Sequence, residues 1–252
     1  MSAEEAANSA SPAPGIACAL VIGASGYVGR AVGAELRRKG IATIAHVRAD
    51  SARLEHWREQ SKTLGAELAT TAWELGAFSQ LIRDRAVSHV FLCLGTTLRR
   101  RLRGSKSSVP DNYESVDFGL SVLVIDACVK SARQPRVVLL SSAGARAESR
   151  SNYLSARGRI ESYLQASGLE FTIARPGIIT GPGRDEFRLF ERVAGAAVDW
   201  SLLWGAVLGM QILRERYRSI GAEELAKALV SHAIDPDSRG KVLPGEKLRD
   251  FP

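Results

Sequence analysis

Cysteine and histidine are scarce in this chain. The cysteines are odd in number and scattered, at Cys18, Cys93 and Cys128. They form no zinc-binding spacing and are typical of small buried apolar residues in a reducing compartment. The histidines are equally isolated, at His46, His56, His89 and His232. We therefore predict no metal site and interpret the histidines as surface residues or residues with satisfied hydrogen bonds.

A signal-peptide pattern is also missing. Residues 2–15 are rich in Ala, Ser and Pro and include Glu4 and Glu5, with neither a basic start nor an apolar core. We expect residues 1–15 to be a disordered lead, and the absence of a signal peptide favours a cytoplasmic protein.

An uninterrupted membrane span is not evident either. The apolar stretch 193–213 is 21 residues long, which would suffice to cross a bilayer. It contains Asp199 and three glycines, and a carboxylate is costly at the bilayer centre. We expect this stretch to line a pocket or a subunit contact, and membrane insertion is disfavoured.

Positive charge is in excess, but the excess is mostly local. The net charge is +7, and five positive charges lie in one short run, at Arg99, Arg100, Arg101, Arg103 and Lys106. The run has no aromatic residues and no nucleic-acid motif, so nucleic acid is its weakest interpretation. The default interpretation of this basic run is a solvated loop. The alternative is that it binds an acidic substrate or a cofactor phosphate.

Apolar runs alternate with helical patterns along most of the chain. The length of 252 residues and the 45% hydrophobic content allow one α/β domain with a sizeable core. Strands are expected at 18–22, 41–47, 66–70, 87–94, 136–141, 169–174 and 242–243. Helices are expected at 27–39, 50–63, 76–85, 113–132, 153–167 and 222–234. This alternation predicts a doubly wound parallel sheet, the Rossmann fold, with its ligand at the carboxyl ends of the strands.

The alternation of strand and helix patterns is interrupted at residues 175–217. This segment begins Arg-Pro-Gly and includes Gly181-Pro182-Gly183. We therefore expect a Rossmann domain over 16–175. Residues 176–252 would be a small C-terminal substrate-side appendage and the closing helix of the same domain.

Three glycines follow the first apolar run at a spacing that suits a dinucleotide. Gly23 permits the tight turn, Gly26 lets the backbone approach a pyrophosphate, and Gly29 lets the following helix pack closely on the strand. The free N–H groups at the start of that helix would face the phosphates. We expect the cofactor to contact this loop at Gly23, Ser25, Gly26, Tyr27, Val28 and Gly29.

The end of the second strand indicates which nicotinamide cofactor is preferred. NAD-specific domains place a carboxylate here for the adenosine ribose, but this chain has His46-Val47-Arg48 and no carboxylate before Asp50. Arg48 could pair with a 2′-phosphate instead. NADP is therefore favoured over NAD.

A serine, a tyrosine and an arginine follow the fifth expected strand. Tyr153 stands eleven residues after Ser142, and Arg157 follows Tyr153 by four residues on the same helix face. A phenol has a pKa near ~10, so a neighbouring cation is needed for acid–base work near neutrality. Ser142, or its neighbour Ser141, would hold the carbonyl of a substrate.

These features together resemble the short-chain dehydrogenase/reductase superfamily. Within it, the chain looks most similar to the atypical branch that includes Tat-interacting oxidoreductase-like and NmrA-like proteins. The matching segments span roughly residues 18–180, in the right order. They are Gly23–Gly29, Val47-Arg48, Cys93–Thr97, Val116-Asp117, Leu140–Gly144, Tyr153–Gly158 and Ala174–Gly177.

The resemblance implies an NADP-binding fold with a Ser-Tyr-Lys catalytic set. It places Leu94, Gly95 and Thr96 beside the cofactor, and Pro176, Gly177, Ile178 and Ile179 near its nicotinamide end. The chain departs from this pattern because Arg157 stands where the family has lysine. Arginine can supply positive charge and bind ribose hydroxyls, but it cannot lose a proton in a relay.

The sequence thus predicts an NADP-dependent oxidoreductase that transfers hydride between NADPH and a carbonyl substrate. Tyr153 would act as the acid, Ser142 would orient the carbonyl, and both Tyr153 and Arg157 would contact the cofactor. The rival interpretation is a redox sensor or interaction module that holds NADP(H) without turnover. A protein partner or a homodimer is compatible with either.

Overall fold

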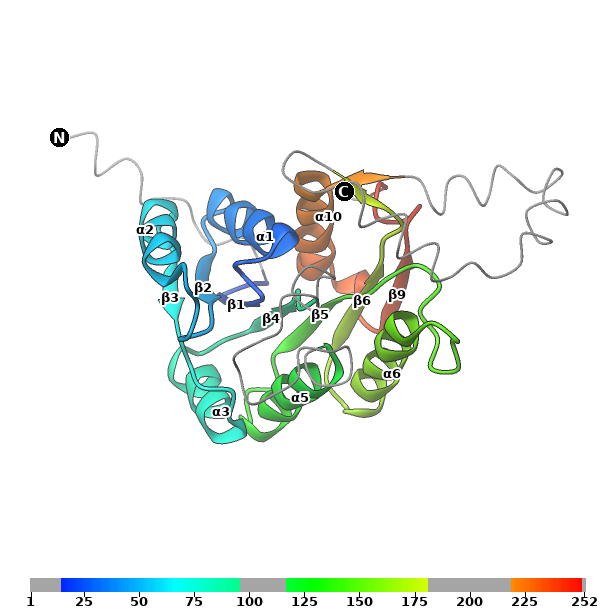
Figure 1. Ribbon diagram of the computed structural model, residues 1–252, viewed down its shortest axis with the longest axis horizontal. Coiled ribbons are helices and arrows are strands. Elements are labelled where there is room, and N and C mark those ends of the chain that lie inside the picture. The colour runs from blue at the N-terminus through cyan, green and yellow to red at the C-terminus, as the bar shows by residue number, and fades with distance from the viewer. Residues whose placement is uncertain (1–14, 96–116, 181–218, 251–252) are drawn as a thin grey trace, which may run out of the picture.

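The computed structural model of the chain describes residues 15–95, 117–180 and 219–250. Its main feature is a seven-stranded sheet in which every neighbouring pair is parallel (Figure 1). From one edge to the other the strands are β3 (Glu67–Ala69), β2 (Ala42–His46), β1 (Cys18–Ile22), β4 (His89–Leu92), β5 (Arg136–Leu140), β6 (Phe171–Arg175) and β9 (Lys241–Pro244).

Helices cover both faces of the sheet (Figure 1). One face carries α1 (Tyr27–Arg38), α2 (Leu54–Leu64) and α10 (Ala222–Ile234). The other carries α3 (Leu75–Asp84), α5 (Leu120–Lys130) and α6 (Asn152–Ala166). A short 3₁₀ helix, Pro236–Ser238, precedes β9. The predicted doubly wound α/β fold is therefore confirmed.

The central strands are mostly apolar because both of their faces are covered. All residues of β4 and β5 are buried. Successive side chains of a strand point to opposite faces, so Val21 joins the core under α1 and α10 while Leu20 and Ile22 join the core under α3, α5 and α6.

The end of the chain completes the main sheet. Helix α10 packs on α1, and β9 pairs with β6 as the outermost strand. The buried guanidinium of Arg136 at the start of β5 donates to the carbonyls of His232, Ala233 and Asp235 at the end of α10. A cation at a helix C-terminus satisfies the last carbonyls and complements the helix dipole, which ties this helix to the sheet.

Within the described residues, each expected strand and helix is present, with ends that shift by a few residues. The helix expected from residue 113 is described only from Asp117, where a π-helical turn leads into α5. One feature was not expected: β7 (Ile179–Thr180) pairs with β8 (Ile220–Gly221) in a separate two-stranded sheet. The expected lead 1–15 and the apolar stretch 193–213 lie outside the described residues, except Gly15.

Candidate functional site

The candidate site residues gather at the carboxyl ends of the parallel strands. The strand order reverses between β1 and β4, because the chain proceeds outward from β1 to β2 and β3 and then returns to β4. In doubly wound sheets this is where ligands bind. The glycine loop follows β1, Leu94 follows β4, Ser142 follows β5 and Pro176 follows β6.

The glycine loop has no room for side chains at two positions. Gly23 has φ +82°, and a Cβ atom there would lie 2.7 Å from the carbonyl oxygen of Cys93. A Cβ atom on Gly29 would lie 2.2 Å from the carbonyl oxygen of Gly23. Only glycine permits this conformation and this close helix–strand packing. The roles predicted for Gly23 and Gly29 in the turn therefore fit the geometry.

The start of α1 is open to an anion. Gly26 is the N-cap residue and offers no side-chain hydrogen bond, and the first turn of the helix has no acidic residue. Ser25 and Gly26 are exposed, whereas the side chain of Val28 is buried in the core. Backbone N–H groups left without side-chain acceptors at a helix start suit a phosphate. Tyr27 is half-buried and donates from its hydroxyl to the carbonyl of Thr180 at 3.3 Å.

Arg48 lies just beyond β2, as predicted. Its side chain is 36% exposed, and its Nε lies 3.6 Å from Asp50 Oδ1. Two further arginines flank Trp57 of α2. Arg30 of α1 and Arg53, which precedes α2, have their guanidinium carbons 5.8 Å and 4.8 Å from the ring centre of Trp57.

His46 ends β2 but points into the core. It is buried, with Nε2 2.9 Å from the carbonyl oxygen of Thr71 and its ring against Trp73 and Phe78. Burial lowers the pKa of His46, so the imidazole is neutral near pH 7. His46 is therefore a satisfied core residue, whereas the side chain of Arg48 is partly exposed.

The two candidate serines after β5 differ in their contacts. Ser141 is buried and donates from its hydroxyl to Glu161. Ser142 is half-buried, and the hydrogen bond from its hydroxyl to the carbonyl of Ala143 is long at 3.5 Å. The geometry therefore favours Ser142 over Ser141 as the serine that can face a substrate.

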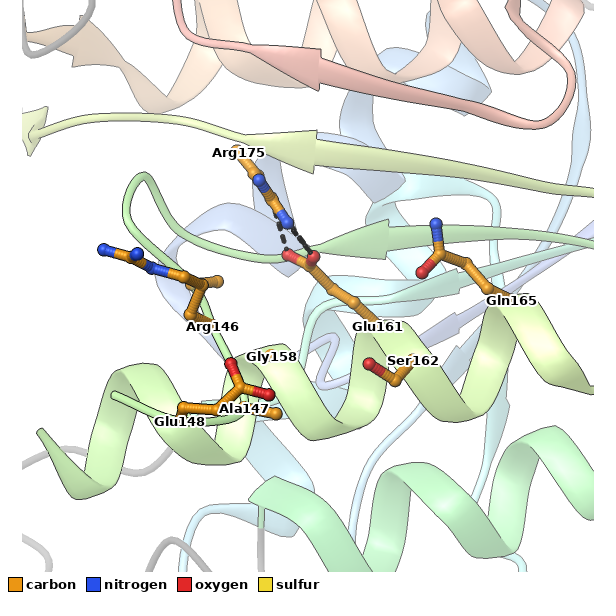
Figure 2. A pocket seen from close by; sticks show the side chains of 9 residues that line it. Arg146, Ala147, Glu148, Gly158, Glu161, Ser162, Gln165 and Arg175 are labelled. Carbon is orange, nitrogen blue, oxygen red and sulfur yellow. Dashed lines mark hydrogen bonds and ion pairs between the residues drawn. The ribbon is translucent and has the colours of Figure 1, made fainter. Parts of the chain in front are cut away.

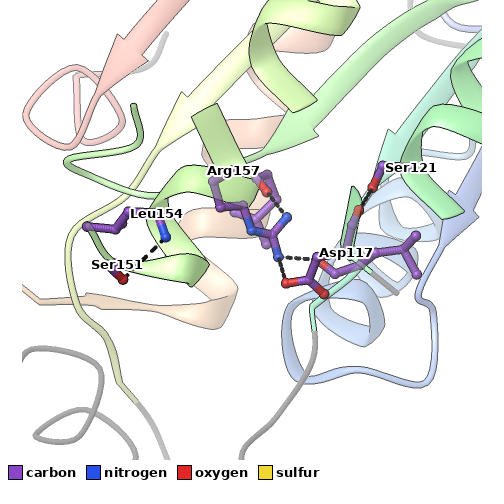
Figure 3. Close-up of polar contacts among 7 residues, drawn as sticks. Asp117, Ser121, Ser151, Leu154 and Arg157 are labelled. Atoms are coloured by element: carbon purple, nitrogen blue, oxygen red, sulfur yellow. Dashed lines mark hydrogen bonds and ion pairs between the residues drawn. The ribbon is translucent and has the colours of Figure 1, made fainter. Parts of the chain in front are cut away.

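Helix α6 presents Tyr153 and Arg157 on one face. The hydroxyl of Ser151 caps the helix by accepting a hydrogen bond from the N–H of Leu154 (Figure 3). Tyr153 is half-buried in the first turn, and the guanidinium carbon of Arg157 lies 5.4 Å from the centre of its ring. The structure thus brings together the tyrosine and the cation that the sequence paired.

Arg157 is held by acceptors from three segments of the chain. Its Nη2 lies 2.6 Å from the carbonyl oxygen of Leu94 and 3.4 Å from Asp117 Oδ2, and its Nη1 lies 3.2 Å from the carbonyl oxygen of Leu140. Figure 3 shows the guanidinium pointing at the Asp117 carboxylate. A buried charge is stable only when it is paired in this way.

The electrostatics of Arg157 follow from these contacts. Burial by itself lowers the pKa of Arg157, but the Asp117 carboxylate and the phenolic oxygen of Tyr153, through charge and a hydrogen bond, outweigh burial and raise it. Arg157 therefore carries a permanent positive charge beside Tyr153.

The remaining predicted cofactor residues are placed as follows. Leu94 is half-buried and Gly95 exposed, and a Cβ atom on Gly95 would lie 3.2 Å from Arg157 Nη2. Pro176 is buried and accepts from the N–H of Ala143 at 2.9 Å. Gly177, Ile178 and Ile179 are half-buried, and the carbonyl of Ile178 accepts from the N–H of Ile220. Thr96 and the basic run Arg99–Lys106 lie outside the described residues.

Sequence reasoning assigned no role to three charged residues near this site. Asp117 pairs with Arg157, while Glu161 and Arg175 pair with each other beside a small open pocket of about 160 Å³ (Figure 2). A signal was present for each. Asp117 and Arg175 belong to segments that match the short-chain dehydrogenase/reductase superfamily. Glu161 follows Arg157 by four residues, so it shares a helix face with Arg157, and buried apolar residues lie on the same helix.

A family model described as NAD(P)H-binding matches residues 23–196, which is more than half of the chain. The chain belongs to this NAD(P)H-binding family. The uncapped helix start and the cramped glycine turn agree with such a cofactor. The family does not distinguish NADP from NAD. The resemblance to a superfamily of nicotinamide-dependent proteins is confirmed, while the atypical branch stays a prediction.

The chain is also similar to curated proteins and, in its fold, to solved structures. Two proteins named "Protein FMP52, mitochondrial" are each 27% identical to the chain. The one from Debaryomyces hansenii matches over 88% of this chain and 90% of its own length, and the one from Candida albicans over 72% and 76%. A putative NAD-dependent epimerase/dehydratase from Bacillus halodurans has the same fold, with a TM-score of 0.61 at 18% identity over 92% of this chain and 98% of its own.

One expectation is contradicted by these relatives. We expected a cytoplasmic protein from the lack of a signal-peptide pattern, but both relatives are named as mitochondrial. The physical reason for the error is that this pattern reports only on secretion, so its absence left organelles open. Among the described residues, no helix is both long and apolar enough to cross a membrane.

Proposed function

We propose that the chain is an NADP(H)-dependent oxidoreductase that reduces a carbonyl compound to the alcohol. The observation that supports this most directly is the contact between Tyr153 and the buried Arg157, at the cofactor end of a sheet from an NAD(P)H-binding family. When bound, the reduced nicotinamide supplies a hydride to the carbonyl carbon. The remaining task, protonation of the carbonyl oxygen, falls to the chain's own residues.

Each residue has a proposed role in that task. Tyr153 donates the proton of its hydroxyl to the carbonyl oxygen, and Ser142 orients that oxygen by a hydrogen bond. Arg157 keeps a positive charge beside Tyr153, which favours the phenolate left after proton transfer. Water then returns a proton to Tyr153. The contact of Arg157 with the cofactor ribose stays a prediction, since the described acceptors of its guanidinium belong to the protein.

The preference for NADP over NAD is supported by the charges beyond β2. Arg48 lies near the exposed carboxylate of Asp50, and Arg30 and Arg53 place two positive charges around Trp57. A 2′-phosphate placed here would gain charge-assisted hydrogen bonds that a 2′-hydroxyl cannot make as strongly. Gly23 to Gly29, with Leu94 and Gly95, would hold the rest of the dinucleotide, and Pro176 to Ile179 would lie at its nicotinamide end.

A second candidate function is a redox sensor that holds NADP(H) without turnover. The observation that favours it is the burial of Arg157, because a guanidinium fixed on backbone carbonyls cannot relay protons as the family lysine can. The names of the two relatives also support a place in mitochondria, which imaging of the chain with a fluorescent protein at its C-terminus would test.

The experiment that tests the proposal has two stages. Titration of tryptophan fluorescence with NADPH and NADH measures binding, and the absorbance of the reduced nicotinamide then follows turnover on a panel of aldehydes and ketones. We expect tighter binding of NADPH and slow turnover that requires Tyr153. Tight NADPH binding without turnover on any substrate would favour the sensor, and binding of neither nucleotide would refute both.

A further inference from the structure

One face of α6 carries a third polar residue that the proposed reaction does not use. Tyr153, Arg157 and Glu161 follow one another at intervals of four residues, so they share a face of the helix. Glu161 is 2% exposed, although it carries a carboxylate.

Two partners satisfy the Glu161 carboxylate. The Nε of Arg175 lies 3.0 Å and 3.1 Å from its two oxygens, and the Nη2 of Arg175 donates to it as well (Figure 2). The hydroxyl of Ser141 donates to Oε1. The hydrogen bond with Glu161 raises the pKa of Arg175, so the guanidinium carries its positive charge near neutrality.

Both partners of Glu161 stand immediately before residues of the proposed site. Ser141 precedes Ser142 at the end of β5, and Arg175 precedes Pro176 at the end of β6. Backbone hydrogen bonds join the same two segments: Ser141 N–H donates to Ala174 at 2.8 Å, and Ala143 N–H donates to Pro176 at 2.9 Å. One carboxylate therefore fixes both strand ends against the helix that carries Tyr153.

Stability alone is a poor reason for such an arrangement. A buried ion pair loses much of its Coulombic gain to desolvation, and well-packed apolar side chains are often as stable or more so. We propose that Glu161 is a positioning residue, which through Ser141 and Arg175 sets Ser142 and the Pro176 segment relative to Tyr153. This inference rests on the proposed function, because the positioned residues are those expected at the nicotinamide end.

The adenosine end of the site provides an internal reference. The glycine loop and Arg48 lie beyond β1 and β2, and no described contact joins them to Glu161. A positioning defect at β5 and β6 should therefore weaken NADPH but not 2′,5′-ADP, which lacks the nicotinamide half. A general loss of structure would weaken both probes.

The test compares the dissociation constants of NADPH and 2′,5′-ADP for the full chain and three variants. Glu161→Gln removes the charge and keeps the shape, and Ser141→Ala is a milder change that removes one hydrogen bond. Glu148→Gln is the matched control, because Glu148 lines the same pocket but is exposed. We expect Glu161→Gln to weaken NADPH about fivefold or more, as for the loss of 1 kcal/mol or more. Ser141→Ala should weaken NADPH less, and 2′,5′-ADP should change less than twofold throughout.

The possible results separate the two proposals. Unchanged NADPH affinity in both Glu161→Gln and Ser141→Ala would overturn the positioning role and leave the proposed function intact. Equal losses for NADPH and 2′,5′-ADP would show a merely structural role and overturn it as well. If Glu161→Gln does not fold, Ser141→Ala decides between these outcomes. If the wild-type chain binds neither probe, the proposed function fails and this inference fails with it.

Discussion

The Nη2 atom of Arg157 lies 3.4 Å from Oδ2 of Asp117, and neither side chain is more than 4% exposed. This ion pair gives a physical reason for arginine at a position where the related superfamily has lysine. The planar guanidinium reaches Asp117, Leu94 and Leu140 at once, whereas a lysine ammonium is a compact point charge that cannot span the same acceptors in one plane.

Removal of Arg157 should therefore be costly to folding. Arg157→Met removes the cation that pairs with the buried Asp117 carboxylate, and we expect a loss of about 3–5 kcal/mol in the free energy of unfolding. Urea denaturation measures this change. Arg58→Met is the control, since Arg58 forms an exposed pair with Glu55 and its loss should cost at most about 1 kcal/mol. Similar losses in the free energy of unfolding for the two variants would contradict the assignment of Arg157 as a buried ion-pair partner.

Substitution by alanine should have opposite effects on stability at two glycines of α1. In Gly29→Ala the new Cβ would lie 2.2 Å from the carbonyl oxygen of Gly23, so the turn must open and both stability and NADPH binding should fall. In Gly33→Ala the Cβ would lie 3.8 Å from Leu64 Cδ2, an ordinary contact. There we expect a gain of about 0.5–1 kcal/mol from helix propensity. Thermal unfolding with and without NADPH measures both effects, and a Gly29→Ala protein that keeps full NADPH binding would count against this loop.

The sequence was most informative where one physical pattern dominates. Continuous apolar runs such as those of β4 and β5 predicted a covered parallel sheet, and the glycine spacing predicted the turn after β1. Strand ends were less certain, because the last residues of β2 include a buried histidine that looks like a surface residue in the sequence.

Pairwise contacts between distant segments could not be predicted. The strands β7 and β8 are two residues long and forty residues apart, too short to show a period. The choice between Ser141 and Ser142 depended on Glu161, a partner twenty residues away in sequence. Acceptors of Arg157 come from the loop after β4, from β5 and from the turn before α5, so only the assembled sheet brings them together.

Arg48 should decide the preference between the two nicotinamide cofactors. Loss of one charge-assisted hydrogen bond to a 2′-phosphate costs ~1.5–3 kcal/mol, about tenfold or more in affinity. We expect Arg48→Ala to weaken NADPH by this amount and to leave NADH nearly unchanged, as measured by fluorescence titration. Arg83→Ala, on the exposed surface of α3, is the control. A wild-type protein that binds both cofactors equally would remove the basis of this prediction.

Mild acid should destabilise the fold through His89. Burial, with a smaller contribution from the charge of Arg136, lowers the pKa of His89 to about 4, from 6.5 in the unfolded chain. Between these values the unfolded state binds more protons than the folded state, so stability falls as the pH falls from 6.5 towards 4. We expect His89→Gln to flatten this dependence in unfolding measured from pH 7.5 down to pH 4.5. Parallel pH profiles for the two proteins would contradict a neutral buried His89.

Tyr153 is the residue on which the distinction between enzyme and sensor depends. Its ring lies over the Arg157 guanidinium in the first turn of α6, and the Tyr153→Phe change removes one hydroxyl while keeping the aromatic contact. If Tyr153 is the proton donor, its loss should reduce carbonyl reduction by about 10²–10⁴-fold. NADPH affinity should change far less, because one neutral hydrogen bond contributes about 0.5–1.5 kcal/mol. Turnover and NADPH affinity are measured on the same protein samples, with Tyr163→Phe as the control, since the exposed hydroxyl of Tyr163 on α6 donates to Asp126 of α5. Full turnover in Tyr153→Phe would refute its role as the acid, whereas a selective loss of turnover would establish the chain as an enzyme rather than a sensor.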